Sequence, residues 1–124
     1  MRTDTKARSI PKAVKLRVAV RDSIFSWPCC INCGRPTPDG GIEWSNAHYI
    51  PRAQGGLGVD ENVLTLCPDC HRDYDQSTKR EEMKSYFREY LKDRYPGWDE
   101  RNLIYRKGME YADRISMQDD SFLP

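Results

Sequence analysis

The clearest periodic pattern of apolar positions in the chain lies between residues 78 and 95. Apolar side chains recur there at the spacing of one helix face, at Met83, Tyr86, Phe87, Tyr90 and Leu91. Thr78-Lys79-Arg80-Glu81 in front of them has the spacing of a capping box, and Tyr95-Pro96-Gly97 ends the pattern. We therefore predict a long helix here whose aromatic stripe packs into the core. Stacking of these rings on bases is the alternative function of the stripe.

The pattern in residues 10–20 fits two structures. Val14, Leu16, Val18 and Val20 alternate as in a strand, whereas Ile10, Val14 and Val18 repeat as in a helix. Ser9-Ile10-Pro11 is a typical helix start, because proline is favoured in the first turn. This start signal favours the helix.

The middle of the chain predicts two strands followed by a helix. Residues 42–50 and 63–66 have strand character, and a loop containing Gly55, Gly56 and Gly58 lies between them. A helix after Cys67-Pro68 is expected to carry His71 and Asp75. A further short helix is expected over residues 99–108. The mixture predicts an α+β fold.

Length and composition indicate one small domain. The chain has 124 residues, of which 38% are hydrophobic and 31% are charged, so its core is thin and needs a staple such as a metal. We expect a flexible basic tail over residues 1–8, a single domain over 9–112 with its core at 30–77, and a loosely ordered acidic tail over 113–124. Neither a secretory signal nor an apolar run of about 18 residues is present, which favours the cytoplasm.

Charge is unevenly distributed although its net value is only +1. Residues 1–21 carry seven basic residues against one aspartate, and Arg8, Lys12 and Lys15 are among them. Such a basic segment suits a phosphate backbone. A merely solvated face is the equally weighted alternative.

Two C-x-x-C pairs are the strongest chemical signal. Cys30 pairs with Cys33, and Cys67 pairs with Cys70, which is the spacing that lets four thiolates converge on one tetrahedral zinc. Cys29 is a fifth cysteine and the alternative to Cys30, whose spacing to Cys33 is the standard one. We therefore predict a closed structural Zn²⁺ site.

The two histidines of the chain lie within this cysteine-framed segment. His48 lies between the pairs, and His71 directly follows Cys70. His71 replacing a cysteine as a zinc ligand is the alternative role. His71 and Asp75 are four residues apart, so they share one helix face, and an imidazole with a carboxylate can hold a divalent ion.

These residues resemble the HNH endonuclease family, also called ββα-metal nucleases. The resemblance covers residues 30 to about 77 and rests on features in a fixed order: His48, Pro51-Arg52, Gly55-Gly56, Asn62 and Cys67-Pro68-Asp69-Cys70-His71. It implies a ββα-metal core pinned by the four-cysteine site, with flanking helices.

The resemblance also implies roles for individual residues. His48 would be the general base, His71 a ligand of a catalytic metal, and Asn62 would hold the loop and orient His48, or bind the metal as in some members. Arg52 would clamp phosphate. The catalytic metal would be Mg²⁺ or another divalent ion such as Mn²⁺ or Ni²⁺.

One position departs from the family pattern. Many members have Asp or His directly before the base histidine as a metal ligand, and this chain has Ala47. The metal is then expected to depend on His71, Asp75 and Asn46, which lies two residues before His48 and so on the same strand face. On this interpretation, Ala47→Asp would tighten metal binding.

The predicted function is a metal-dependent DNA endonuclease that nicks DNA or cuts both strands. One alternative is a zinc-stabilised nucleic-acid-binding module with a decayed nuclease site, and another is a zinc-ribbon adaptor for protein partners. The resemblance to small HNH proteins of phages suggests a role in DNA packaging with terminase as a partner. We expect a monomer.

Overall fold

The fold is mixed helix and strand, and a computed structural model describes residues 7–106 of it. The helices are α2 (Lys12–Arg21), α3 (Pro68–Gln76) and α4 (Arg80–Arg94), and short 3₁₀ turns lie between them. The strands are β1 (Ser23–Ile24), β2 (Trp27–Pro28), β3 (Ala47–His48) and β4 (Val63–Leu64). The expected α+β class is confirmed. No helix within the described range has the length and apolar character to cross a bilayer.

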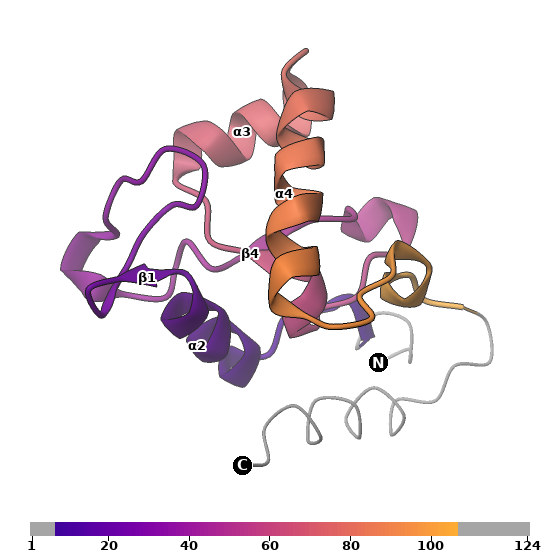
Figure 1. Ribbon diagram of the computed structural model, residues 1–124, viewed down its shortest axis with the longest axis horizontal. Helices are drawn as coiled ribbons and strands as arrows, with labels where there is room; N and C mark the ends of the chain where they lie inside the picture. The colour runs from indigo at the N-terminus through magenta and orange to yellow at the C-terminus, as the bar shows by residue number, and fades with distance from the viewer. Residues whose placement is uncertain (1–6, 107–124) are drawn as a thin grey trace.

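The β3–β4 hairpin lies at the centre of the fold. Ala47 pairs with Leu64 and His48 with Val63 in antiparallel register. α4 crosses in front of β4 in Figure 1, with α3 beside its upper end and α2 at the lower left. The main core forms under α4, where Phe87 and Leu91 are fully buried and Tyr74 of α3 meets Phe87 edge to face, with ring centroids 5.0 Å apart.

α2 forms a second, smaller core with β4. Val14 and Val18 are fully buried against Val63, which confirms the helical spacing over the alternating one. Proline at 11 precedes the first helical residue, where its missing N–H costs nothing.

Two arginines of α2 turn inward instead of lying on a basic surface. Arg17 forms a bidentate pair with Asp60, with 2.8 and 3.0 Å between nitrogen and oxygen. Arg21 binds Asp22 and also donates to the carbonyl of Val63 at 2.7 Å. These two charges are neutralised inside the protein, so the N-terminal segment is less basic outside than its sequence indicates.

Three local expectations were wrong. The expected strand over residues 42–50 is reduced to β3, because the chain turns where the Ser45 amide donates to the Ile42 carbonyl at 3.1 Å. The expected Thr78 cap is absent, and the Ser77 hydroxyl instead accepts the Lys79 amide at 3.0 Å. The helix expected from residue 99 is a 3₁₀ turn at Glu100–Leu103. Residues 107 and 108 of that expectation lie outside the described residues.

The expected tails fall largely outside the described residues, at 1–6 and 113–124. The described part of the N-terminal tail is folded, because Ala7 is 1% exposed and its carbonyl accepts the Gly58 amide at 2.9 Å. Residues 7 and 8 therefore pack on the loop around Gly58 and on His48, and the expected domain bounds of 9–112 remain a prediction.

Candidate active site and zinc centre

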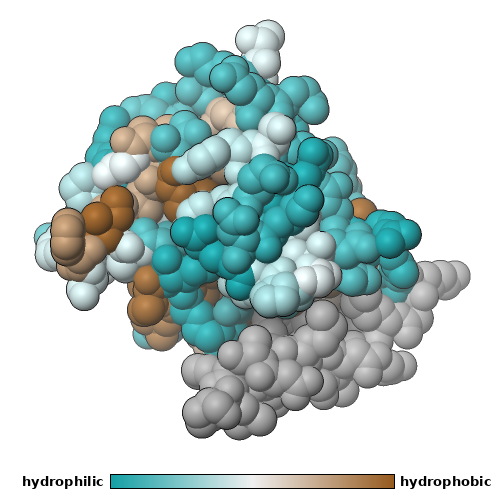
Figure 2. All heavy atoms as spheres, viewed as in Figure 1, coloured by the Kyte–Doolittle hydropathy of each residue, from teal (hydrophilic) through white to brown (hydrophobic). Residues whose placement is uncertain are grey.

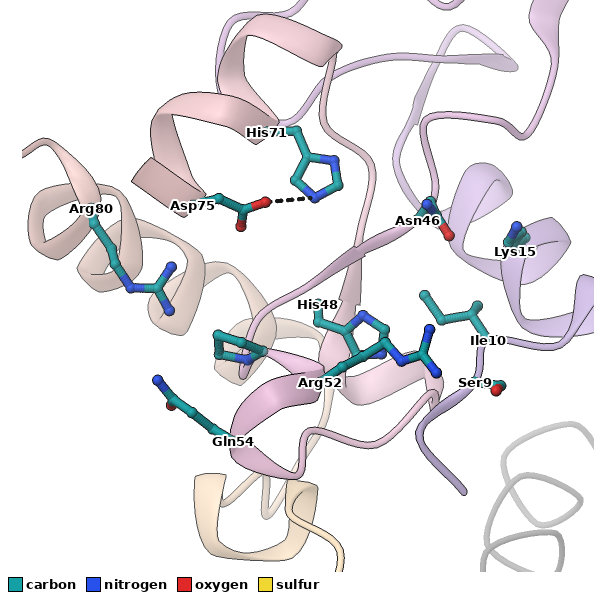
Figure 3. Close-up of a pocket in the computed structure, with 11 residues that line it drawn as sticks. Ser9, Ile10, Lys15, Asn46, His48, Arg52, Gln54, His71, Asp75 and Arg80 are labelled. Atoms are coloured by element: carbon teal, nitrogen blue, oxygen red, sulfur yellow. Dashed lines mark ion pairs between the residues drawn. The ribbon is translucent and has the colours of Figure 1, made fainter. Parts of the chain in front are cut away.

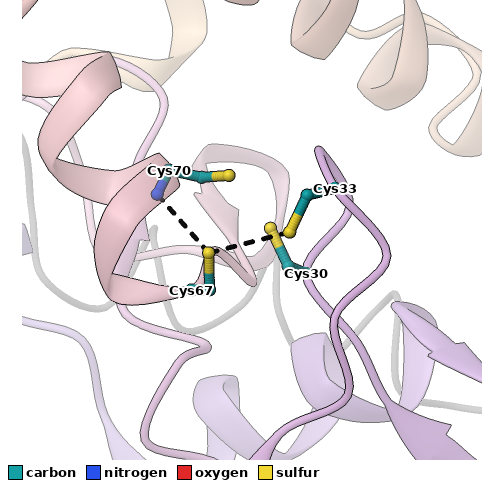
Figure 4. A group of neighbouring side chains, drawn as sticks. All are labelled: Cys30, Cys33, Cys67 and Cys70. Carbon is teal, nitrogen blue, oxygen red and sulfur yellow. Dashed lines mark hydrogen bonds between the residues drawn. The ribbon is translucent and has the colours of Figure 1, made fainter.

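The four cysteines of the two C-x-x-C pairs form one cluster. Their sulfur atoms all lie within 4.8 Å of one another. Figure 4 shows Cys67 and Cys70 at the start of α3 facing the loop that carries Cys30 and Cys33. The sulfurs of Cys33 and Cys67 are 3.7 Å apart. Two thiolates at about 2.3 Å from a tetrahedral zinc would be about 3.8 Å apart, so the donor set fits zinc. Cys30 belongs to the cluster, whereas the neighbouring Cys29 thiol donates to the Trp27 carbonyl instead.

The surroundings of the cluster suit cysteines that lose their protons when a metal cation binds. Burial raises the pKa of Cys30 and of Cys70, so neither thiol ionises readily by itself. N–H groups already point at the sulfurs: the Cys70 amide lies 3.4 Å from the Cys67 sulfur, and the Asn32 side chain lies 3.3 Å from the Cys70 sulfur. Such donors stabilise metal-bound thiolate.

The cluster fixes the start of α3. Cys67 is the N-cap residue and Pro68 begins the helix, which places Cys70 in its first turn and His71 directly after it. One turn later Asp75 follows, and its carboxylate lies 3.4 Å from Nε2 of His71. Both side chains are partly exposed, at 34% for His71 and 50% for Asp75. A zinc knuckle would therefore hold an imidazole and a carboxylate together at the protein surface.

These two side chains line one wall of an open cleft of about 700 Å³. The rest of the lining comes from the N-terminal segment, α2, β3 with the residues on either side of it, and the start of α4. The full lining is Ser9, Ile10, Lys15, Asn46, His48, Pro51, Arg52, Gln54, His71, Asp75 and Arg80. Figure 3 shows the His71–Asp75 pair on one side of this cleft, with His48 and Asn46 on the β3 side. Sequence reasoning named most of these residues.

Alternation along β3 and the residue before it decides which side chains reach the cleft. Asn46 and His48 line it, whereas Ala47 is fully buried in the main core and pairs with Leu64. A side chain at position 47 therefore points into the protein. This corrects the expectation that a carboxylate placed there could reach a metal.

His48 is held by a main-chain carbonyl. Its Nε2 lies 2.9 Å from the carbonyl oxygen of Arg8. Because a carbonyl can only accept, Nε2 must carry the proton, which leaves Nδ1 of the neutral ring as the basic nitrogen. Burial lowers the pKa of His48, and the nearby charge of Arg52 acts in the same direction. The ring is thus neutral near pH 7.

Asn62 holds the backbone and does not line the cleft. Its side-chain oxygen accepts the Ile50 amide at 2.8 Å, and its side-chain nitrogen donates to the carbonyls of Ile50 and Leu57 at 3.2 and 2.8 Å. The residue is fully buried. Because the side chain is fully buried and is not part of the cleft lining, it is not placed to bind a metal there.

The expected DNA-binding residues differ in where they lie. Lys15 and Arg52 line the cleft, but exposed Lys12 is not part of its lining. The Arg8 guanidinium donates to the Arg52 carbonyl at 3.0 Å. Arg80 was missed by sequence reasoning: it begins α4, donates to the Tyr74 carbonyl at 2.7 Å and lines the cleft. Only the short α3–α4 connection hints at it, since three residues separate the two helices.

The comparisons with known proteins agree with this geometry. Residues 30–77 match the HNH endonuclease family, from the first cysteine pair to the end of α3. A relative is the type IV methyl-directed restriction enzyme EcoKMcrA of Escherichia coli (strain K12), which is 36% identical over 58 residues. The match covers 44% of this chain and 21% of the relative, so the chain spans about a fifth of that protein's length. No solved structure gives a significant match. Residues 30–77 of this chain are thus similar to an HNH endonuclease domain.

Proposed function

We propose that the protein is a metal-dependent endonuclease that hydrolyses phosphodiester bonds of DNA. One observation carries the proposal: His48 and the His71–Asp75 pair line the same open cleft from two separate elements. The chemistry needs both, because a phosphodiester is anionic and its alkoxide leaving group is poor. A base and a cation site on different elements leave room for the phosphate between them.

The His71–Asp75 pair is the proposed site of the catalytic cation. An imidazole nitrogen and a carboxylate oxygen 3.4 Å apart can hold a divalent ion such as Mg²⁺, Mn²⁺ or Ni²⁺. When bound, the ion would neutralise negative charge on the phosphate and on the leaving oxygen. Asn46 lines the cleft as well and offers a further oxygen. Water and phosphate oxygens would complete the coordination.

His48 is the proposed general base. Its Nδ1 accepts a proton from the attacking water while the new bond between oxygen and phosphorus forms and the bond to the leaving oxygen breaks. The lowered pKa keeps the ring neutral and ready to accept that proton near neutral pH. The hydrogen bond to the Arg8 carbonyl fixes the ring without occupying Nδ1.

The cationic side chains of the cleft are the proposed contacts to the DNA backbone. Lys15, Arg52 and Arg80 line it against the single carboxylate of Asp75, so the cleft attracts anions. An arginine can also bind two phosphate oxygens as a fork. Asn62 is proposed to act through the loop: by tying Ile50 to Leu57 it holds the strand that carries His48.

A nucleic-acid-binding module with a decayed nuclease site is the second candidate. One observation favours it: within residues 7–106, a group of three or more His, Cys, Asp or Glu donors occurs only at the four cysteines. The catalytic cation would thus have only two strong protein ligands, which predicts weak metal binding.

Incubation of supercoiled plasmid with the pure protein separates the two candidates. The endonuclease is expected to convert plasmid to nicked or linear forms with Mg²⁺, Mn²⁺ or Ni²⁺, and to stop when a chelator is added. The decayed module is expected to retard plasmid on a gel without cutting it under any of these conditions. A role in phage packaging with terminase, and a monomeric state, remain predictions; affinity capture and light scattering test them.

A further inference from the structure

Residues 7–9, which we call the strap, contact the His48 ring through the main-chain carbonyl of Arg8. The Ala7 carbonyl accepts the Gly58 amide at 2.9 Å, and the Arg8 carbonyl contacts Nε2 of His48 at 2.9 Å. The Arg8 side chain also donates to the Arg52 carbonyl at 3.0 Å. One short segment is thus tied to the glycine loop, to the proposed base and to a cleft-lining residue.

Gly58 is the residue that lets the strap come this close. A Cβ atom at position 58 would lie 1.9 Å from the Ser9 carbonyl oxygen and 2.4 Å from the Ser9 carbonyl carbon. Gly58 is not among the residues with positive φ, so its backbone conformation is open to any amino acid. The glycine is therefore required by close approach of the strap alone. An alanine here would push the strap away and leave the loop conformation allowed.

Burial on the other side also holds the strap. Ala7 is 1% exposed and belongs to the main core cluster, which also contains Leu57 and Val59 on either side of Gly58. The Arg8 carbonyl cannot move away from His48 unless Ala7 leaves this core. The contact to the imidazole is therefore built into the packing and does not depend on the Arg8 side chain.

We propose that the strap is a positioning element for the reaction: it fixes the His48 ring in the Nε2–H tautomer and orientation, and Gly58 is the residue that admits it. The inference rests on the proposed function, since it assigns a second role around the same base. It adds that the N-terminal segment, outside the residues matched to the HNH family, is needed to complete the site.

Nuclear magnetic resonance of the two imidazoles tests the contact directly, because the chain has only two histidines. In the wild type, two-bond ¹H–¹⁵N correlations are expected to show His48 as a single Nε2–H tautomer. Its Hε2 proton is expected to exchange slowly with water and to show a nuclear Overhauser contact to the Arg8 α-proton. Absence of this slowly exchanging proton in the folded wild type overturns the proposal, whatever the variants do.

Gly58→Ala is the main variant. It is expected to keep zinc and DNA affinity, lose the protected Hε2 proton, show averaged tautomers, and nick plasmid about 10–100-fold more slowly at saturating metal. If Gly58→Ala does not fold, Ala7→Glu replaces it as the test. This change places a charge at the buried end of the strap and should give the same loss of the protected proton and of rate. Leu91→Val, which lowers stability in the core under α4, is the control and should keep the protected proton and the wild-type rate.

Three results are distinguished by these measurements. A folded Gly58→Ala that keeps the protected proton, or loses it and still cuts at the wild-type rate, overturns the positioning role. A wild type with the protected proton that cuts no DNA with any divalent ion contradicts the proposed function, while the strap–His48 contact stands.

Discussion

Asn62 and Ile50 are joined by a pair of hydrogen bonds, 2.8 Å from the Ile50 amide and 3.2 Å to the Ile50 carbonyl. The Asn62 side-chain amide pairs with the Ile50 main chain as a neighbouring strand would, and so holds the loop between β3 and β4. The asparagine is thus explained by the backbone groups that it satisfies.

Asn62→Asp should destabilise the domain more than its similar size suggests. A carboxylate can accept the Ile50 amide but cannot donate to the carbonyls of Ile50 and Leu57, and it would be charged while buried. We expect a loss of about 2–5 kcal/mol in the free energy of unfolding. Urea denaturation measures it. An unfolding free energy within about 0.5 kcal/mol of the wild type would contradict this role.

Cys67→Ser and Cys29→Ser form a matched pair for the zinc centre. Both cysteines are buried, but only Cys67 belongs to the four-sulfur cluster. Cys67→Ser should lose bound zinc and unfold at room temperature, because metal binding supplies folding free energy. Cys29→Ser should keep about one zinc per chain, since a hydroxyl can also donate to the Trp27 carbonyl. Elemental analysis and circular dichroism decide it, and zinc retained by Cys67→Ser would refute the assignment.

Lys15→Ala and Arg17→Ala separate DNA contact from internal charge pairing. Lys15 lines the cleft, whereas Arg17 is paired with Asp60. Lys15→Ala should weaken DNA binding and reduce its salt dependence by about one ion, with unchanged stability. Arg17→Ala should cost about 1–3 kcal/mol of stability. Salt-dependent binding titrations and thermal melts measure both effects. If Arg17→Ala weakened DNA binding and left stability unchanged, Arg17 would be a surface contact to DNA and not an internal ion pair.

Ala47→Asp should unfold the protein and fail to improve metal binding. Position 47 lies on β3, is paired with Leu64 of β4 and is fully buried in the main core, so the carboxylate would be desolvated without a partner. Thermal melting should show the loss, and Asn46→Asp is the informative comparison because position 46 lines the cleft. A stable Ala47→Asp that lowers the metal concentration needed for cleavage would show that the strand faces the other way.

The ionised Glu100 carboxylate should make the stability of the fold depend on pH in the acid range. Burial opposes its ionisation, but hydrogen bonds from Tyr49 and Arg88 outweigh burial and lower the pKa of Glu100 below its ordinary 4.5. A lowered pKa stabilises the fold above about pH 4.5, and this contribution is lost as pH falls through the folded-state value. The melting temperature of the wild type should exceed that of Glu100→Gln at pH 7, and the gap should narrow towards pH 3. Zinc release in acid affects both proteins alike. A gap that is constant with pH would contradict the argument.

The sequence predicted the parts of this molecule that depend on spacing. The C-x-x-C spacing, His71 and Asp75 one turn apart, and the buried positions Met83, Phe87 and Leu91 of α4 all follow from local geometry. Tyr86 of the predicted stripe is instead half exposed. These distances are set by the backbone of one element, so a pattern in the sequence is enough.

What the sequence missed depends on long-range geometry. Arg17 and Arg21 look like surface charge until their acidic partners at Asp60 and Asp22 are seen. In the sequence, position 47 was expected to face the metal. Which face of β3 is buried depends on its pairing with β4 and on the core, and neither can be read from the local pattern. The contact between the Arg8 carbonyl and His48 involves a main-chain atom, so the identity of the residue at position 8 does not predict it.

The central claim is that His48 removes a proton from water in a metal-dependent cut. The most direct measurement is the single-turnover rate of plasmid nicking by His48→Ala and by wild type, at saturating divalent metal and with zinc content verified. Arg72→Ala, an exposed change outside the cleft lining, is the control that should leave the rate unchanged. The account predicts a rate about 10²–10⁴-fold lower for His48→Ala, with DNA binding and melting temperature near those of the wild type. A folded His48→Ala that nicks plasmid at the wild-type rate would contradict it.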